Sequence, residues 1–371
     1  MLKYVSLNFK TRKAFTIMSL KKIFLFGCTL LVIGCQKNDA LLVEQPKDIN
    51  TPVGMVWIPG NSFTQGARDN DSFALPHEKP SHPVEVDGFF MDITEVTNAQ
   101  FKKFVDATGY ITTAERPIDW EEMKKTLPEG TPKPCDSILA PGSLTFNKNV
   151  KQINDFNNYG QWWNWNSGAN WKHPQGKNST VVGKDNYPVV HISYQDALAY
   201  CKWANRRLPT EAEWELAAQG NLKNAIYTWG NDNAKLDSKA NTWQGKFPTE
   251  NNPLDGFAFI APVKSFSSNS VGLYDMAGNV WEYTQDWYNV EYYQELLNQK
   301  KVARNPMGAI KAYNPNNPLQ KERVIKGGSF LCNASYCASF RISARMGMTE
   351  DSSSDHVGFR TVATVAMLKK K

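Results

Sequence analysis

Hydrophobic and polar residues alternate in two short segments at the start of the expected folded region. Residues 54–60 place Met, Val, Trp and Ile between glycines and a proline, which predicts a strand ending in a turn. Residues 83–90 alternate similarly and predict a second strand. A helix ending near Ala107 is expected next, because Thr94 or Thr97 can cap its first turn and apolar residues recur at helical spacing.

Two further helices have clear start signals. The first runs from about Ser193 to Ala204, with Ser193 as a suitable N-cap and Asp196 at the position of a capping-box acid. The second begins at Thr210 and carries acidic residues in its first turn, where they suit the helix dipole. Apolar residues on one side of each helix predict that both pack against the core.

The rest of the chain shows little regular periodicity. Residues 115–160 are rich in Pro, Asn and Lys and are interpreted as a long excursion. Beyond residue 220 the chain is rich in Asn, Gly, Asp and Trp, which favours loops. These patterns predict one mixed α/β, loop-rich domain over residues 51–367.

The N-terminus has the features of an export signal. An apolar run, Ile23–Gly34, follows two lysines and is too short to span a bilayer comfortably. It leads into Cys35 in a context that resembles a bacterial lipobox, whose cysteine is lipidated. We therefore expect a signal peptide over residues 1–34, with Met18 as an alternative start, and a polar tether over residues 35–50. The alternative is an ordinary secretory signal that contains a cysteine by chance.

The distribution of charge narrows the range of partners. The formal net charge is +6, but the signal peptide carries six basic residues and no acid, so the remaining chain has 36 basic and 36 acidic residues. We find no basic stripe and expect no nucleic-acid partner. The expected protein is a monomeric lipoprotein of the cell envelope, held by its lipid at the membrane and either facing the periplasm or in the outer membrane.

Four cysteines remain outside the signal peptide and Cys35. Two of them, Cys332 and Cys337, stand five positions apart behind a Gly-Gly-Ser turn. Such a pair is compatible with a disulfide, with half of a metal site or with a redox-active couple. The other two are Cys135 and Cys201, and the sequence does not choose among the possible pairings.

Two loop segments offer oxygen ligands for a hard cation such as Ca²⁺. One combines Asn241 and Thr242 with residues 255–257, and the other covers residues 275–282. Asx turns are the alternative explanation for isolated Asn and Asp residues in loops.

Eight segments occur in the order found in formylglycine-generating enzymes, the sulfatase-modifying factors. They include Arg-Leu-Pro-Thr-Glu-Ala-Glu-Trp-Glu at 207–215 and Gly-Asn-Val-Trp-Glu at 278–282. The sequence resembles this family over nearly all of residues 51–367. The resemblance implies a compact, poorly regular α/β fold, distantly similar to C-type lectin domains. The remaining segments are residues 54–60, 95–98, 168–174, 272–275, 327–337 and 358–360.

The resemblance also implies an activity. Cys332 and Cys337 would be the active-site thiols and would bind Cu(I), with the cysteine of the substrate as third ligand. O₂ would be the co-substrate, and Ser329 would lie beside the reacting oxygen. The substrate would be an unfolded sulfatase segment of the Cys-x-Pro-x-Arg type, whose cysteine becomes Cα-formylglycine.

Other residues receive roles only through this resemblance. The substrate-binding residues would be Arg345, His356, Trp281 and Tyr336, and a structural ion pair is the alternative for Arg345. Cys201 keeps a family cysteine position without its partner and is expected to pack as a small apolar residue. The Ca²⁺ ligands would be Asn241, the Thr242 carbonyl, Asp255 and the Phe257 carbonyl at one site, and the carbonyls of Asp275, Gly278 and Val280 with the Glu282 carboxylate at the other.

Other functions are compatible with the same family. One is a non-catalytic envelope lipoprotein in which Cys332 and Cys337 form a structural disulfide. Another is an oxidase that acts on a different exported protein. An iron-dependent sulfoxide synthase is not expected, because the five histidines show no ligand-like spacing such as His-x3-His.

Overall fold

A computed structural model describes residues 40–369 of the chain. The predicted signal peptide and Cys35 lie outside the described residues. From Leu41 onward the described residues belong to one folded unit. Within that part of the chain no helix is long and apolar enough to cross a membrane.

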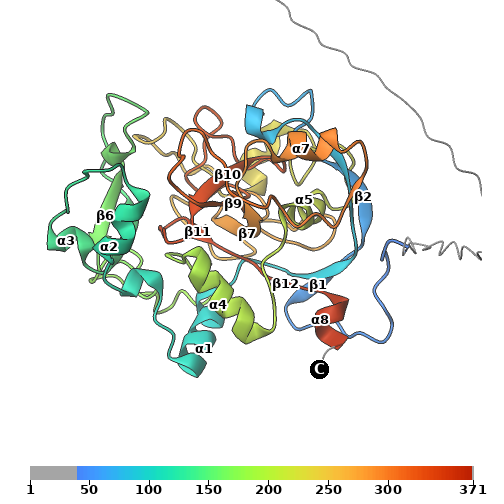
Figure 1. The fold of residues 1–371 in the computed structure, drawn as a ribbon, viewed down its shortest axis with the longest axis horizontal. Coiled ribbons are helices and arrows are strands. Elements are labelled where there is room, and N and C mark those ends of the chain that lie inside the picture. Colours follow the sequence, from blue (N-terminus) through green and yellow to red (C-terminus); the bar gives the residue numbers. More distant parts are fainter. Residues whose placement is uncertain (1–39, 370–371) are drawn as a thin grey trace, which may run out of the picture. The chain divides into compact units, whose positions relative to one another are not determined.

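A four-stranded sheet forms the centre of the fold (Figure 1). Its strand order is β10-β9-β7-β11, with β9 antiparallel to both neighbours and β11 parallel to β7. All four strands come from the last quarter of the chain, so the loops between them meet at this sheet. The strands are β7 Trp281–Trp287, β9 Glu322–Lys326, β10 Arg345–Thr349 and β11 Val357–Gly358.

Three smaller sheets surround the central one. The predicted strand at 54–60 is confirmed, but the segment at 83–90 forms two strands rather than one. The strand is interrupted at Gly88, whose Cα lies so close to the Trp57 ring that a Cβ would not fit. One sheet consists of β1 Met55–Ile58, β4 Phe89–Asp92 and β12 Val362–Ala363. Another consists of β2 Asn61–Gln65, β3 His82–Val86 and β8 Ala303–Arg304. The third pairs β5 Gly142–Phe146 with β6 Trp163–Ser167.

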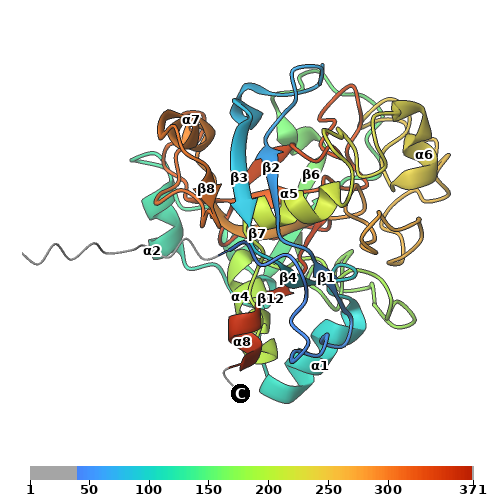
Figure 2. The ribbon, with the colours of Figure 1, turned by 90° about the vertical axis from the view of Figure 1, so that its right-hand side faces the viewer.

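The three predicted helices are confirmed with their caps. Thr97, Ser193 and Thr210 each accept a backbone N–H at the start of a helix, and a capping box closes all three. These helices are α1 Asn98–Thr108, α4 Tyr194–Ala204 and α5 Glu211–Gln219. Figure 2 shows α5 in front of β7, and α1 lies beside α4 in Figure 1. The shorter helices are α2 Trp120–Met123, α3 Asp136–Leu139, α6 Leu236–Lys239, α7 Tyr292–Asn298 and α8 Val365–Lys369.

The excursion at 115–160 contains a strand, β5, that its sequence pattern does not predict. Together with β6 it forms a hairpin that lies with α2 and α3 at the left of Figure 1. In β5 the polar residues Ser143 and Thr145 are buried, at 0% and 5% exposure, and so is Phe146 at 4%, while Leu144 is half-buried. Because polar and hydrophobic residues are both buried, no alternation of the two marks this strand.

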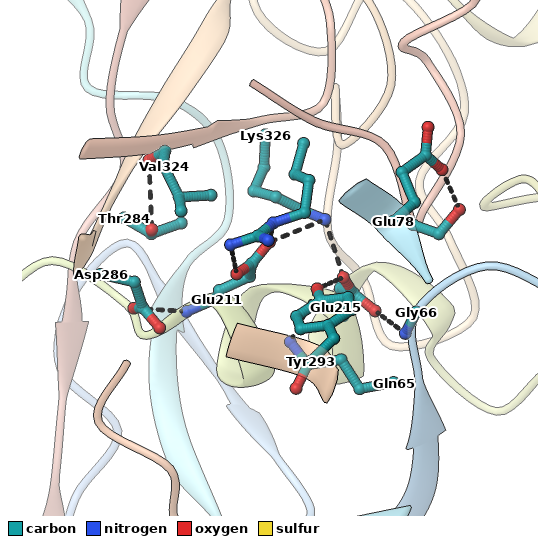
Figure 3. Close-up of polar contacts among 12 residues, drawn as sticks. Gln65, Gly66, Glu78, Glu211, Glu215, Thr284, Asp286, Tyr293, Val324 and Lys326 are labelled. Carbon is teal, nitrogen blue, oxygen red and sulfur yellow. Dashed lines mark hydrogen bonds and ion pairs between the residues drawn. The ribbon is translucent and has the colours of Figure 1, made fainter. Parts of the chain in front are cut away.

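Buried ion pairs attach α5 to the central sheet (Figure 3). Lys326 Nζ on β9 lies 2.8 Å from Glu215 Oε1 and 3.6 Å from Glu211 Oε1. Arg345 adds two contacts to Glu211, from Nε at 2.8 Å and from Nη2 at 2.9 Å. Because buried charges are tolerated only when paired, the acids of the 207–215 motif serve the fold rather than chemistry.

Candidate functional site

The loop between β9 and β10 carries the cysteine pair. It begins with Gly327 and Gly328, whose φ angles of +89° and +72° lie in the left-handed region that favours glycine. A Cβ on Gly328 would approach the backbone of Phe340 to 2.9 Å. The next turn closes tightly, because Cys332 N donates to Ser329 O at 2.9 Å and Ser329 N donates to Cys332 Sγ at 3.4 Å. The two glycines therefore bring Cys332 back over the sheet.

Asn333 fixes the second cysteine relative to the first. Its backbone oxygen accepts from Cys337 N at 2.9 Å, and its Oδ1 accepts from Ser335 N at 2.8 Å. Its Nδ2 donates to the carbonyl oxygens of Trp243 at 3.0 Å and Gly245 at 3.1 Å. Asn333 is not among the predicted site residues, although an Asn directly after the first cysteine is a signal for an Asx turn.

The two thiols of the pair are free, and each acts on the pKa of the other. Cys332 is 2% exposed, and burial is the main reason why its pKa lies well above the usual value. Burial also acts on Cys337, but the hydrogen bonds from Cys332, Ser339 and Asn333 outweigh it and lower the Cys337 pKa. Cys337 is therefore the thiol that ionises first. No group of three or more His, Cys, Asp or Glu residues within 40–369 is arranged to hold a metal ion.

Paired thiols fit a Cu(I) ion better than a hard cation. Thiolates are soft ligands, and two that face each other suit a linear site with room for one further sulfur. A site with two protein ligands would leave the third position to an incoming thiol. Such a site does not need a group of three ligating residues from the protein.

Ser329 and His356 lie beside the cysteines. Leu331 N donates to Ser329 Oγ at 3.2 Å, so the Ser329 hydroxyl hydrogen is available for His356 Nδ1, also 3.2 Å away. Burial, with a smaller contribution from His191, lowers the His356 pKa to about 3, so the ring is neutral at neutral pH. The Trp163 ring lies 4.8 Å from the His356 ring. The structure thus adds Trp163 to the predicted neighbours of the site.

The other three predicted substrate-binding residues have different surroundings. Tyr336 is 37% exposed and stacks on the Phe247 ring at 4.5 Å, which fits a wall of a substrate groove. Trp281 is 2% exposed in the main core, so it does not fit contact with an external peptide. Arg345 does not fit either: besides its pair with Glu211, it donates to backbone oxygens at 3.1 and 3.3 Å, as its structural alternative requires.

The predicted residues of the first Ca²⁺ site lie together. Asn241 is 1% exposed, and its Oδ1 has no hydrogen-bond partner within the described residues. Asp255 accepts from Thr242 N and Phe257 N, both at 2.9 Å. Since buried oxygens are nearly always paired, the unpaired amide oxygen of Asn241 fits a ligand of a hard cation.

The predicted second Ca²⁺ site does not fit the role expected for Glu282. Both Glu282 oxygens accept from Arg360 at 2.6 Å, and Trp214 Nε1 adds a third hydrogen bond at 2.8 Å. A cation would have to break this buried ion pair. Glu95 and Asp275 lie beside the pair, and burial raises the pKa of both, that of Asp275 to about 6. Both carboxyls therefore hold their protons more tightly than usual, and the predicted ligand carbonyls of Gly278 and Val280 follow Asp275 in the same loop.

The remaining sequence predictions concern packing. Cys201 is 2% exposed and unpaired in the main core, which confirms its role as a small apolar residue. Cys135 is exposed and does not pair with it. Trp162 and Trp171 are buried at 1% and 3% exposure, as expected if most tryptophans in this segment serve the core.

Known proteins resemble this chain over most of its length. The family model of the sulfatase-modifying factor enzyme 1-like domain matches residues 39–365. Formylglycine-generating enzyme from Mus musculus is 42% identical over 315 residues, 83% of this chain and 74% of the mouse protein. Inactive C-alpha-formylglycine-generating enzyme 2 from Mus musculus is 35% identical over 319 residues, 85% of this chain and 87% of that protein. The solved structure of PvdO from Pseudomonas aeruginosa gives a TM-score of 0.55 at 21% identity, covering 84% of this chain and 94% of that chain, which shows the same fold.

Proposed function

Because this chain belongs to the formylglycine-generating-enzyme family, we propose that it converts a cysteine of a sulfatase into Cα-formylglycine. The observation that carries this proposal is the pair of free thiols, Cys332 and Cys337, which are close enough to act on each other's pKa. Relatives with active and inactive names share the family, so likeness alone does not decide activity. A permanent disulfide between these thiols would leave no ligand for a metal ion.

Cys332 and Cys337 would hold one Cu(I) ion, since both side chains are soft ligands. When bound, copper would supply the activation of O₂. The residues of the chain prepare the site around it. Burial keeps water from Cys332, the lowered pKa of Cys337 favours its thiolate, and neutral His356 orients the hydroxyl of Ser329.

The electron balance of the reaction requires a reductant. Converting the CH₂–SH group of cysteine into CHO releases the sulfur as H₂S and removes two electrons from Cβ. Reduction of O₂ to the aldehyde oxygen and one water consumes four electrons. We propose that an external thiol supplies the other two and is oxidised to a disulfide.

The surroundings of the thiols favour an unfolded substrate. Cys332 is 2% exposed, so a sulfatase cysteine can approach it only as part of a flexible, extended segment. Tyr336 and Trp163 would form the walls along which such a segment lies. We infer that the sulfatase is an exported one that is met before it folds, with this protein held at the envelope membrane by a lipid on Cys35.

A conversion assay tests the proposal. The full-length protein would receive a peptide with a Cys-x-Pro-x-Arg motif, Cu(I), O₂ and a thiol reductant, and mass spectrometry would follow the aldehyde. The wild type and the exposed-site control Cys135→Ser should both form formylglycine, whereas Cys332→Ser should form none. Absence of product from the wild type, or full activity of Cys332→Ser, would refute the assignment.

A further inference from the structure

A cavity that does not include the thiol pair lies close to the Ser329 turn. It has a volume of about 170 Å³, and none of its lining residues belongs to the thiol pair. Asp355 and Phe330, the chain neighbours of His356 and Ser329, form part of its floor. The cavity is also lined by two aromatic residues and two lysines, Trp171, Phe259, Lys148 and Lys184.

Asp355 is an incompletely paired carboxylate in the floor. It is 2% exposed, and its Oδ2 accepts from Phe146 N at 3.0 Å and from Gln175 Nε2 at 3.3 Å. Its Oδ1 is buried and has no hydrogen-bond partner in the described part of the chain. Leaving such an oxygen unpaired costs free energy, so a ligand that donates a hydrogen bond to it would recover that cost. Trp171 Nε1, in the same lining, is also buried without a partner.

Positive charge stands at the rim of the cavity. Lys148 Nζ lies 4.0 Å from the centre of the Phe259 ring, and Lys184 Nζ lies 6.0 Å from the centre of the Tyr187 ring. Lys148 is close enough to Asp355 for the carboxylate to act on its pKa, although burial, the larger effect, lowers that pKa. With two lysines and one aspartate, the lining carries an excess positive charge.

Size and chemistry together define the ligand class. A void of about 150 Å³ holds a molecule the size of benzene, so this cavity accommodates one aromatic ring. We propose that the cavity binds a small organic anion with an aromatic body and a hydroxyl group. The hydroxyl donates to Asp355 Oδ1, the ring packs against Phe330 and Trp171, and the anionic group pairs with Lys148 and Lys184.

The probe for this site is 4-hydroxyphenylacetate, titrated into the full-length protein by calorimetry. We expect a dissociation constant below about 1 mM, because a single ring with two polar anchors supplies roughly 4 kcal/mol or more. Phenylacetate lacks the hydroxyl and should bind about tenfold more weakly. Tyramine keeps the ring and hydroxyl but reverses the charge, and it should not bind.

Two variants assign the contacts. Asp355→Ala, which removes the acceptor, should abolish the preference for 4-hydroxyphenylacetate over phenylacetate, and Lys148→Met should weaken both ligands by about fivefold. Lys151→Met is the matched control, since this exposed lysine is not part of the lining, and it should change nothing. Failure of 4-hydroxyphenylacetate to bind the wild type, equal binding of tyramine, or an unchanged preference in a folded Asp355→Ala protein would overturn the proposal.

Discussion

At the scale of single residues, the account depends on how unequal the two thiols are. Cys332 is sealed in the core and keeps its proton, whereas Cys337 receives the hydrogen bonds that stabilise a thiolate. Both thiols lose their protons when they bind a metal ion.

The first prediction concerns the stoichiometry of Cu(I) binding. The wild type should bind one equivalent, because two thiolates are needed for a linear site. Cys332→Ser and Cys337→Ser should each weaken binding by more than about a hundredfold, whereas Cys135→Ser should bind as the wild type does. Competition with a chromophoric Cu(I) chelator measures this. Tight binding by a variant that has lost one thiol of the pair would contradict the two-ligand site.

The sequence predicts the position of the cysteine pair, but not the surroundings of Trp281 and Arg345. The cysteine spacing and the Gly-Gly-Ser turn are visible in the chain, and they lead to the correct loop. Trp281 and Arg345 were assigned to substrate binding, but both are buried by partners that come from elsewhere in the chain. Contacts between residues far apart in the chain leave no pattern in the local sequence, so the burial of these two side chains could not be predicted.

At the scale of elements, local signals explain what could be predicted. The sequence predicts α1, α4 and α5 with their caps, because a capping box involves only four consecutive residues and is visible in the local sequence. β7 was missed because Glu282, Thr284 and Asp286 resemble loop residues. Each is buried against a distant partner, Arg360, the Val324 carbonyl and Glu211 N respectively. A polar strand of this kind is recognised only when its partners are known.

The cysteine loop gives the second prediction. Asn333→Ala should lower peptide conversion by about tenfold or more while the protein stays folded, because its side chain ties the loop to the carbonyls of Trp243 and Gly245. Asn333→Asp keeps the Oδ1 acceptor but loses both donors, so it should be similarly impaired. Circular dichroism checks the fold beside the activity assay. Normal activity in Asn333→Ala would show that the cysteine loop does not depend on these two hydrogen bonds.

The contact between β7 and α5 gives a prediction about pH. Burial, with the Glu211 charge as a smaller cause, raises the pKa of Asp286 to about 8. Since the folded state holds this proton more tightly than the unfolded chain, stability should decline as pH rises from about 4 through 8, by at most about 1.4 kcal/mol per unit. Asp286→Asn should flatten that decline by roughly 1–2 kcal/mol between pH 6 and 8.

Urea unfolding at the two pH values measures this effect. Asp69→Asn, at an exposed position, is the control and should retain the wild-type dependence. Equal losses of stability in Asp286→Asn and the wild type would show that another group titrates.

At the scale of the whole molecule, the fold combines small sheets with long loops that need other support. Buried ion pairs such as Lys326 with Glu215 provide part of it. Ala218 and Ile342 pack in one apolar cluster. The unpaired Asn241 oxygen indicates where a bound cation would hold the loops.

Calcium should therefore stabilise the protein. At a Ca²⁺ concentration of about a hundred times the dissociation constant, the gain is about 2.7 kcal/mol, which thermal unfolding with and without a chelator would detect. Asn241→Ala should remove most of the Ca²⁺-dependent shift, because it deletes the oxygen that lacks a protein partner. Asn251→Ala, at a neighbouring loop position, is the control. An Asn241→Ala protein that still responds fully to Ca²⁺ would place the ion elsewhere.

The most direct test of the central claim is the time course of formylglycine formation in a Cys-x-Pro-x-Arg peptide, followed by mass spectrometry. With Cu(I), O₂ and a thiol reductant, the wild-type protein should convert the peptide over many turnovers. Cys337→Ser should convert none under the same conditions. A wild type that holds Cu(I) but leaves the peptide cysteine intact, or a Cys337→Ser variant that turns over normally, would contradict the assignment of this thiol pair as the catalytic centre.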